Sequence, residues 1–553
     1  MIQVPVQAAG ARVAVSTPAT GSQTGATRRG TSRLDRAAGR GCLVALLAAF
    51  GWAFLDGVQR YPALSDDEGT YVAQAWAVLQ HGELAHYTYW YDHPPLGWIQ
   101  LAGLTGLLGW AAPGASAVVQ ARYLMFIPAL VSVALVYVIA RRMDQSRWMG
   151  LLAVALFGFS PLGLPLLRQV YLDNVALPWV LSAVALALDR RGRLWSAAGA
   201  GACLAVAVLS KETMLLLLPA VMFAAWQHSN PQTRSFVLTA LGTSFVLIVA
   251  FYPLLAVLKG ELLPGPGHVS LLEAIRFQLS GRSSTGSGLQ PGTGSYGLVS
   301  GWIGADPALV AGGCLLAPIA LLSRALRPAA VAVLLLVTAA ARPGYLPAPL
   351  VIAALPLCAL LLTGGAGRIL AAARTLSPPA LRPGAVALAA LAILGASAGV
   401  GWWRAAPISY VVHTDATDSA LAAKQWIVHN VDPRARILVD DSFFVDLADV
   451  GFDPGLGVVW FYKLDFSANL DPSVVRALPN GHRSFDYVVS TRIIRSAVQE
   501  NLGRFQEVRA ALDASTPVAT FGTGADVVEV RRLVAPDTAS GRIPPPVPAQ
   551  ARP

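Results

Sequence analysis

The sequence predicts an α-helical polytopic membrane protein with about eleven transmembrane helices, a large first extracytoplasmic loop and a C-terminal soluble α/β domain. Composition supports this fold class, since 55% of the residues are apolar, only 13% are charged, and the mean hydropathy is +0.54. After His413 the long apolar runs give way to alternating helix-like and strand-like segments. This change marks where the membrane domain ends.

The apolar runs follow a polar N-terminal tail. Residues 1–38 are rich in Ser, Thr, Gly and Arg, so we expect a disordered cytoplasmic tail. The next run is predicted to be the first span and not a cleaved signal, because no Ala-x-Ala-like site followed by a soluble domain appears. The transmembrane domain is predicted over 39–404, with spans at 40–58, 118–140, 148–164, 172–189, 194–210, 212–227, 235–258, 305–323, 327–342, 345–364 and 384–403.

Basic residues predict the orientation. Arg-rich connectors at 141–147, 189–193, 323–327 and 368–382 fall on the same side as the N-terminal arginines. Because cytoplasmic loops carry an excess of Lys and Arg, this side is predicted to be cytoplasmic, and the C-terminal domain extracytoplasmic.

The net charge and the cysteines exclude other classes of protein. We attribute the net charge of +10 to membrane topology, since the chain has no basic-aromatic stripe typical of a nucleic-acid binder. The four cysteines lie in apolar segments, so neither a disulfide framework nor a zinc site is predicted. Membrane lipids are the expected surroundings.

The first extracytoplasmic loop, predicted over 59–116, holds the stretch most indicative of chemistry, Ser65–Trp98. It opens with Asp66, Asp67 and Glu68 at the start of a helical pattern, continues through Tyr87, Tyr89, Trp90 and Tyr91, and ends in Asp92-His93-Pro94-Pro95. One interpretation is structural: Ser65 and Glu68 form a capping box, and the acids complement the helix dipole. The other is catalytic, because interfacial aromatics and a second acid–histidine pair follow directly.

Basic groups collect at the predicted outer ends of the spans. They are His93, Arg122, Arg168 and Lys211, and they face the compartment that holds the acid cluster. Ionisable groups at membrane depth need a partner or a role. Asp173, Asn174 and Glu212 are near enough in sequence to form simple ion pairs with them. Alternatively, the basic set binds the phosphate of an anionic lipid-linked donor.

Two further segments are predicted outside. The loop 259–301 includes His268, Glu273, Arg276 and Gln278 and ends in GRSSTGSGLQPGTGSYG, which lacks the ending of a phosphate-binding P-loop and is expected to be mobile and to close over a ligand. The α/β domain is predicted over 413–535, and the Pro-rich residues 536–553 are predicted to be disordered. The spacing of Asp440, Asp441, Asp446, Asp449 and Asp453 does not match an EF-hand, which favours a solvated surface.

Short motifs resemble one family. DEGTY at 67–71 resembles the Asp-Glu-x-x-Tyr of the first external loop in polyprenyl-phosphate-sugar-dependent glycosyltransferases of the C superfamily, which includes protein O-mannosyltransferases and lipid A aminoarabinose transferases (families 39 and 83). HPPLGW at 93–98 is similar to their (His/Lys)-Pro-Pro-Leu segment. Further matches in the same order are ARYLMFIPAL at 121–130, Ser160-Pro161 with Arg168 and Asp173, and Leu209-Ser210-Lys211. The C-terminal domain resembles those of actinobacterial members of this group.

The resemblance implies an inverting glycosyltransferase that moves a sugar from a polyprenyl-phosphate donor to a hydroxyl on a glycan, lipid or protein acceptor outside the cytoplasmic membrane. Asp67 matches the family's catalytic aspartate, with Asp66 as an alternative base. Glu68 would orient the acceptor or cap the helix, and Tyr71 and Asp173 would support the site. His93, Arg122, Arg168 and Lys211 would neutralise the leaving phosphate. The acids would permit a divalent cation, Mg²⁺ or Mn²⁺, without requiring one.

Two other functions stay open from the sequence. A transporter or flippase of lipid-linked glycans should carry charges through the middle of its spans and an internal repeat, whereas here the ionisable groups gather at the outer ends. An inactive relative whose C-terminal domain only binds cell-envelope glycan is the third hypothesis. The identity of the sugar and of the acceptor is not encoded in any motif.

Overall fold

The structure is a computed structural model that describes residues 25–84, 91, 93–109, 116–265, 269–465, 476–500 and 503–533. Tyr87, Tyr89, Trp90, Asp92, His268 and the predicted tail 536–553 lie outside the described residues. The chain divides into two compact units at Ala45 and Leu46, and the site described below belongs to the second unit. The first helix begins at Gly25, inside the segment predicted to be disordered, since Ala, Arg and Leu favour helix.

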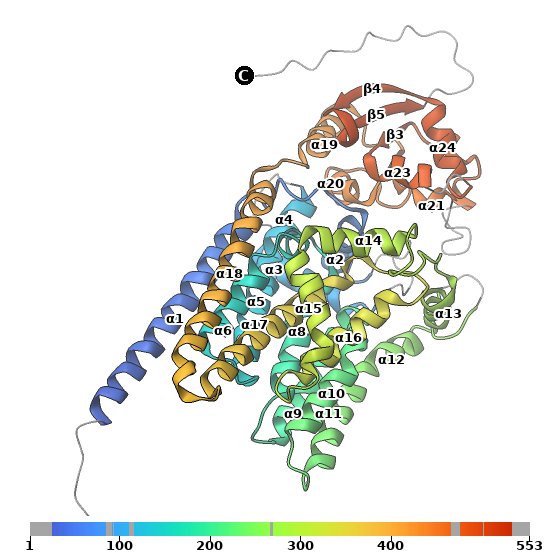
Figure 1. The fold of residues 1–553 in the computed structure, drawn as a ribbon. Coiled ribbons are helices and arrows are strands. Elements are labelled where there is room, and N and C mark those ends of the chain that lie inside the picture. The colour runs from blue at the N-terminus through green and yellow to red at the C-terminus, as the bar shows by residue number, and fades with distance from the viewer. Residues whose placement is uncertain are drawn as a thin grey trace, which may run out of the picture. The chain divides into compact units, whose positions relative to one another are not determined.

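Helices make up most of the chain before residue 413 (Figure 1). Their bounds are α1 Gly25–Leu55, α2 Asp66–His81, α3 Leu96–Leu108, α4 Ala117–Leu124, α5 Phe126–Arg142, α6 Arg147–Gly158, α7 Gly163–Arg168, α8 Leu172–Ala187, α9 Leu194–Ser210, η1 Glu212–Leu217, α10 Leu218–His228, α11 Arg234–Val249, α12 Phe251–Leu258, α13 Leu271–Arg276, η2 Phe277–Gly281, α14 Gly294–Ala305, α15 Pro307–Ala320, α16 Arg327–Ala341, η3 Ala348–Leu350, α17 Val351–Thr375, η4 Pro379–Leu381 and α18 Arg382–His413.

Each of the eleven segments predicted as spans contains helix. By length and hydropathy, five helical runs among the described residues could cross a membrane, or six if α14 and α15, bent by 110°, form one span. The five runs are Arg36–Leu55, Ala117–Arg142, Arg234–Leu258, Ala348–Thr375 and Pro379–Asn430. Five more apolar helices, α3, α6, α8, α9 and α16, are shorter than a full span. The chain is therefore a helical membrane protein, and the number of eleven spans stays a prediction.

Breaks in the helical backbone explain the short helices. Between α6 and α7, Ser160 and Pro161 interrupt the helix, and Pro161 cannot donate the next backbone hydrogen bond. Between α9 and η1, Lys211 adopts an extended conformation. These breaks place polar side chains at the ends of apolar helices. In the bundle, α8 packs against α5 and α9, α11 packs against α9, and α17 contacts α6, α15 and α16.

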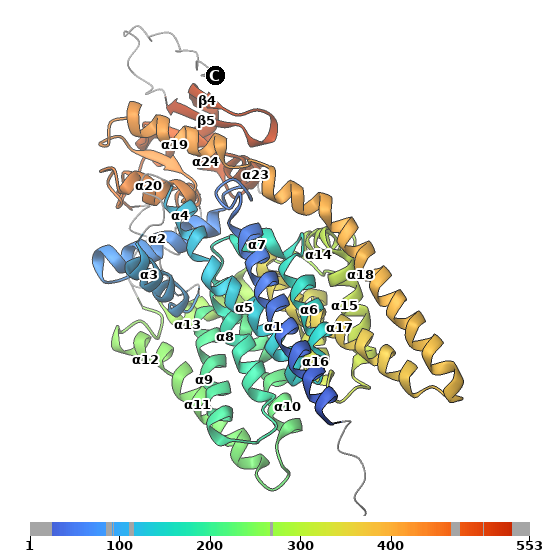
Figure 2. The ribbon, with the colours of Figure 1, turned by 90° about the vertical axis from the view of Figure 1, so that its left-hand side faces the viewer.

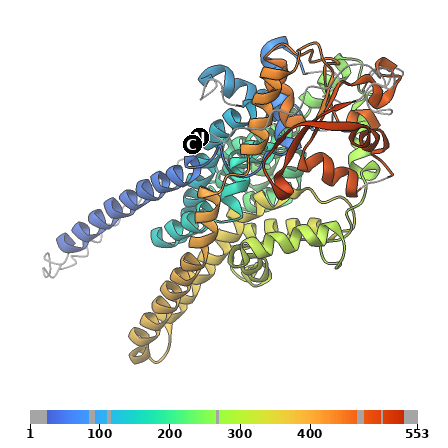
Figure 3. The same cartoon turned by 90° about the horizontal axis from the view of Figure 1, so that it is seen from above.

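A mixed sheet follows α18 and the helix α19 (Asp418–Asn430). The strands are β1 Ile437–Val439, β2 Val458–Trp460, β3 Tyr487–Ser490, β4 Ser515–Phe521 and β5 Val528–Leu533, in the order β2-β1-β3-β5-β4. β1 pairs in parallel with β2 and β3, whereas β5 pairs antiparallel with β3 and β4. The view from above shows β4 and β5 side by side (Figure 3). Short helices complete the domain: η5 Asp441–Phe443, α20 Phe444–Ala448, α21 Tyr462–Asp465, η6 Gly481–Ser484, α23 Arg492–Glu500, α24 Gln506–Asp513 and η7 Gly524–Asp526.

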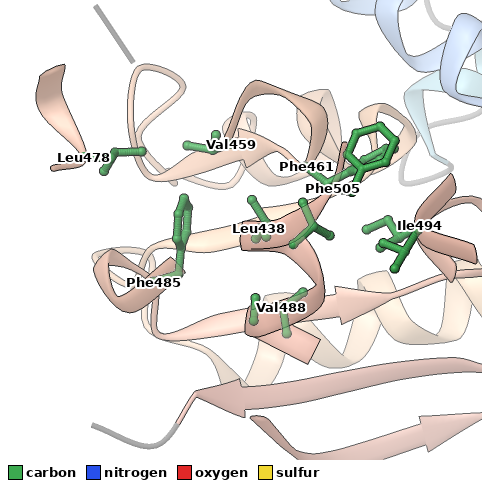
Figure 4. Close-up of a cluster of buried hydrophobic side chains, with 11 residues drawn as sticks. Leu438, Val459, Phe461, Leu478, Phe485, Val488, Ile494 and Phe505 are labelled. Atoms are coloured by element: carbon green, nitrogen blue, oxygen red, sulfur yellow. The ribbon is translucent and has the colours of Figure 1, made fainter. Parts of the chain in front are cut away.

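The C-terminal domain has its own apolar core. Leu438, Val459 and Val488 from three neighbouring strands meet Ile494 of α23 and Phe505 before α24 (Figure 4). The domain lies next to α2, which belongs to the predicted first loop, and next to α4, which directly follows that loop (Figure 1, Figure 2). It therefore adjoins the acid cluster.

Candidate active site

The acid cluster forms the first turn of α2. Ser65 is the N-cap, its hydroxyl accepts from the Glu68 amide, and the Glu68 carboxylate accepts from the Ser65 amide, so the predicted capping box is confirmed. Successive helical residues point about 100° apart. As a result Asp66 and Asp67 face solvent, whereas Glu68 is completely buried.

Glu68 forms a buried ion pair with Arg122 of α4. Nε of Arg122 donates to Oε1 of Glu68 at 2.7 Å, and one terminal nitrogen donates to Oε2 at 2.6 Å. Arg122 also donates to the carbonyls of Pro62 and Ala63, and the Val170 amide donates to Glu68. Both side chains have an exposed fraction of 0%. Here Arg122 is committed to Glu68 and to backbone carbonyls, and not to the space where a phosphate would bind.

Arg168 has a similar structural position. Its five N–H groups donate to five backbone carbonyls, those of Ala53, Phe54, Asp56, Tyr61 and Val411. These carbonyls belong to the end of α1, the segment after it, and the end of α18. Arg168 is fully buried, so it joins three parts of the chain and has no N–H group left for a ligand.

His93 and Lys211, both predicted to belong to the site, lie next to each other in the structure. Nδ1 of His93 lies 3.0 Å from Oε2 of Glu212, and its Nε2 lies 3.2 Å from the Tyr71 hydroxyl and 3.0 Å from Nζ of Lys211. Only a donor can face the Glu212 carboxylate, so we assign the proton to Nδ1. Nε2 then accepts from Tyr71 and Lys211, and both His93 and Lys211 are buried.

The His-Pro-Pro-Leu-Gly segment brings His93 to Lys211. α3 starts directly after the two prolines, and Gly97 lies so close to α9 that a Cβ there would be 2.8 Å from the Ser210 carbonyl oxygen. The Gln100 amide also donates to the Ser210 hydroxyl at 2.7 Å. Ser210, the residue before Lys211, is thus where α9 contacts α3.

Asp67 lies within electrostatic range of this cluster. Its carboxylate is near enough to Lys211, Tyr171 and Tyr345 to act on them electrostatically. Asp173 also lies near Lys211, is buried, and accepts from the Thr213 hydroxyl at 3.4 Å on one oxygen only. Of the predicted site residues, the structure groups Asp67, Tyr71, His93, Lys211 and Asp173, whereas Glu68, Arg122 and Arg168 form the buried framework beside them.

Comparisons with known proteins show which proteins the chain is similar to. Residues 92–256 match the family described as dolichyl-phosphate-mannose-protein mannosyltransferase. A search of curated proteins finds no match. Among solved structures, ArnT from Cupriavidus metallidurans in the apo state superposes with a TM-score of 0.55 and 16% identity, covering 90% of this chain and 99% of that chain.

The same ArnT bound to undecaprenyl phosphate superposes with a TM-score of 0.55 and 17% identity, covering 88% of this chain and 97% of that chain. The Archaeoglobus fulgidus oligosaccharyltransferase tethered with an acceptor peptide gives 0.51 and 13%, with coverage of 88% and 73%. The chain thus shares the fold of these glycosyltransferases, and residues 92–256 match the mannosyltransferase family model. At these identities the structural likeness establishes the fold alone.

Within this fold, the sequence alone did not indicate Arg282 and Tyr345 as site residues. The Arg282 guanidinium stacks on the Tyr345 ring at 4.2 Å, and both side chains act electrostatically on Lys211 or Asp67. Thr285, three residues on, bonds to the Gly344 carbonyl, which ties the Gly- and Ser-rich loop to the connector before α17. The one available signal was the Arg in the otherwise uncharged stretch GRSSTGSGLQPGTGSYG.

The described residues give no ligand set for a divalent cation. In the ranges that the structure describes, no three His, Cys, Asp or Glu side chains gather in a way that could hold a metal ion. The Mg²⁺ or Mn²⁺ that the acid cluster would permit is therefore not placed, and no step of the proposed reaction uses it.

The pKa of Asp66 departs from its ordinary value. Its side chain keeps contact with solvent, yet the surrounding protein and the carboxylates of Asp67 and Asp440 raise the pKa of Asp66 to about 7. The protonated form of Asp66 is therefore well populated in the folded protein near neutral pH.

Glu68→Gln should lower the free energy of unfolding by about 3–5 kcal/mol, because it leaves the buried Arg122 without a counter-charge. Asp67→Asn, in the same turn but exposed, should stay within about 0.5 kcal/mol of the wild type. Thermal unfolding in detergent compares the two variants. Equal destabilisation by both would contradict the structural role of Glu68.

Asp66→Asn should change how stability depends on pH. Because folding raises the pKa of Asp66, its stabilising contribution is complete below pH 4 and is lost as the pH rises through about 7. The melting temperature of the wild type should therefore fall, relative to Asp66→Asn, between pH 5 and pH 8. Glu83→Gln, at an exposed position beyond the end of α2, is the control and should follow the wild type.

Proposed function

We propose that this chain is an inverting glycosyltransferase that moves a sugar from a polyprenyl-phosphate donor to a hydroxyl acceptor. The observation that carries the proposal is that Asp67, an exposed carboxylate in the first turn of α2, lies within electrostatic range of buried Lys211. A base for the acceptor and a cation for the leaving phosphate are the two groups that this transfer needs. The fold of enzymes solved with undecaprenyl phosphate or an acceptor peptide supports the same conclusion.

The reaction is a single displacement. The acceptor oxygen attacks the anomeric carbon while its proton passes to the Asp67 carboxylate. The bond from the anomeric carbon to the phosphate oxygen breaks, and its electron pair stays on the phosphate. Attack and departure occur on opposite faces, so the anomeric configuration inverts. Asp67 suits the base because Glu68 is held by Arg122 and the protonated form of Asp66 is well populated near neutral pH.

Positive charge on the phosphate side comes from Lys211 and Arg282. Lys211 is positioned by His93 and Glu212, and Arg282 is half-buried with its guanidinium stacked on Tyr345. His93 presents a polar ring between Lys211 and Tyr71. We assign Arg122 and Arg168 to the framework, since the ion pair and the backbone carbonyls already use their donors.

The setting follows from the expected orientation. We place the transfer on the outer face of the cytoplasmic membrane, with the N-terminus inside, in cell-envelope glycan synthesis or protein glycosylation. Glycan, lipid and protein hydroxyls are the acceptor classes. Asp66 and Asp67 at the entrance favour a neutral or cationic acceptor over an anionic one.

Asp67→Asn should lower transfer by ~10²–10⁴-fold, because the amide cannot take the acceptor proton. Sugar transfer is measured from a set of radiolabelled polyprenyl-phosphate sugars in membranes that contain the wild type, Asp67→Asn or Asp66→Asn at matched expression. Asp66→Asn is the control and should keep most of the activity.

Two results would overturn this assignment. Loss of transfer with Asp66→Asn but not with Asp67→Asn would move the base by one position. A wild type that transfers nothing from any donor, yet speeds the movement of lipid-linked sugar across the membrane, would identify a transporter instead.

Arg282→Gln should lower the transfer rate by ~10–100-fold, the effect of losing one charge-assisted contact to the leaving phosphate. Arg276→Gln is the matched control, since Arg276 is exposed on α13, before the same loop segment. Initial rates with the productive donor compare the two variants. Equal rates for Arg282→Gln and the wild type would remove Arg282 from the site.

A further inference from the structure

The C-terminal domain contacts the catalytic turn of α2 backbone to backbone. A Cβ added at Gly69 would lie 2.2 Å from the Asp441 carbonyl carbon and 2.3 Å from the Ser442 amide nitrogen. Atoms that are not bonded never come so close, so this approach requires glycine at position 69. Gly69 lies two residues after Asp67 in the same helical turn.

The buried carboxyl group of Asp441 stabilises this contact. The hydroxyls of Thr70 and Tyr462 both donate to Oδ2 of Asp441, the latter at 3.0 Å. Asp441 is 1% exposed, and in the described part of the chain its Oδ1 has no hydrogen-bond partner. Burial, with the nearby Asp66 carboxylate as a further cause, raises the pKa of Asp441 well above its usual range. Asp441 therefore accepts hydrogen bonds from both α2 and α21.

The same stretch, Asp440–Asp449, also holds α4; we call it the docking segment. Asp446 accepts from the Ala117 amide and the Ser116 hydroxyl, both at 2.7 Å, at the start of α4. Asp449 accepts from the Trp76 indole nitrogen of α2 at 2.8 Å. α2 carries Glu68 and α4 carries Arg122. The docking segment therefore contacts both helices that contribute to the buried ion pair (Figure 2).

We propose that the docking segment holds the first turn of α2 in place, and that Asp441 is thereby a positioning residue for the base Asp67. This inference rests on the proposed function for its catalytic part. The C-terminal domain is then a fixed part of the catalytic loop and not a freely tethered binding module. A shift of the base by about 1 Å is enough to cost ~10²-fold in rate.

The first test is Gly69→Ala in the full-length protein. The added methyl group must displace the docking segment, so we expect faster hydrogen–deuterium exchange in the peptides around 66–70 and 440–449 together. We also expect kcat to fall by at least about 10-fold while KM for the donor is unchanged. Gly103→Ala is the control, because a Cβ at Gly103 of α3 meets open space, and it should change neither readout.

A second pair of variants separates positioning from general stability. Asp441→Asn keeps an acceptor oxygen for Thr70 and Tyr462, so it should retain near-wild-type kcat, whereas Asp441→Ala should lower kcat as Gly69→Ala does. Unchanged exchange and kcat in Gly69→Ala, or equal activity of Asp441→Ala and Asp441→Asn, would overturn the inference.

The glycosyltransferase proposal and the positioning role of the docking segment can be contradicted separately. If the wild type transfers no sugar but Gly69→Ala still loosens both peptides, the glycosyltransferase proposal fails while the docking of the segment onto α2 stands. If transfer occurs and Gly69→Ala leaves both peptides protected, the glycosyltransferase proposal stands and the positioning role fails.

Discussion

The buried ion pair between Glu68 and Arg122 is the interaction on which the site depends. Either charge alone in this environment would cost several kcal/mol, so α2 and α4 can pack only with both present. Further hydrogen bonds from the pair reach Pro62, Ala63 and Val170, which fixes the loop before α2 and the start of the segment that leads into α8. The segment around the start of α2 thus has one defined geometry.

Helical geometry then gives three consecutive acidic residues different surroundings. Because each residue turns the helix by about 100°, Glu68 points inward to Arg122 while Asp66 and Asp67 point to solvent. Desolvation by the surrounding protein, with the nearby carboxylates of Asp67 and Asp440 as further causes, raises the pKa of Asp66 to about 7. The structural interpretation of the cluster is confirmed for Ser65 and Glu68, and the catalytic interpretation stays a proposal for Asp67.

The sequence predicts what local patterns determine. Apolar runs place helices in all eleven predicted spans, and Ser65 with Glu68 predicts the capping box. Contacts between distant segments carry no such pattern. Nothing near Arg168 in the chain indicates that its partners are carbonyls of α1 and α18. Likewise, Arg282 and the docking segment reach the site only through tertiary packing, and helix breaks at Ser160 and Lys211 make the number of true spans hard to predict.

The central claim is a direct displacement at the anomeric carbon, with Asp67 as base and a lipid phosphate as leaving group. Its most direct test is the anomeric configuration of the product, determined by nuclear magnetic resonance after transfer by the wild type from a donor of known configuration. The account predicts inversion, so a β-linked donor should give an α-linked product. Retention of configuration would contradict it, because retention requires a second displacement through an intermediate that this arrangement of acids does not provide.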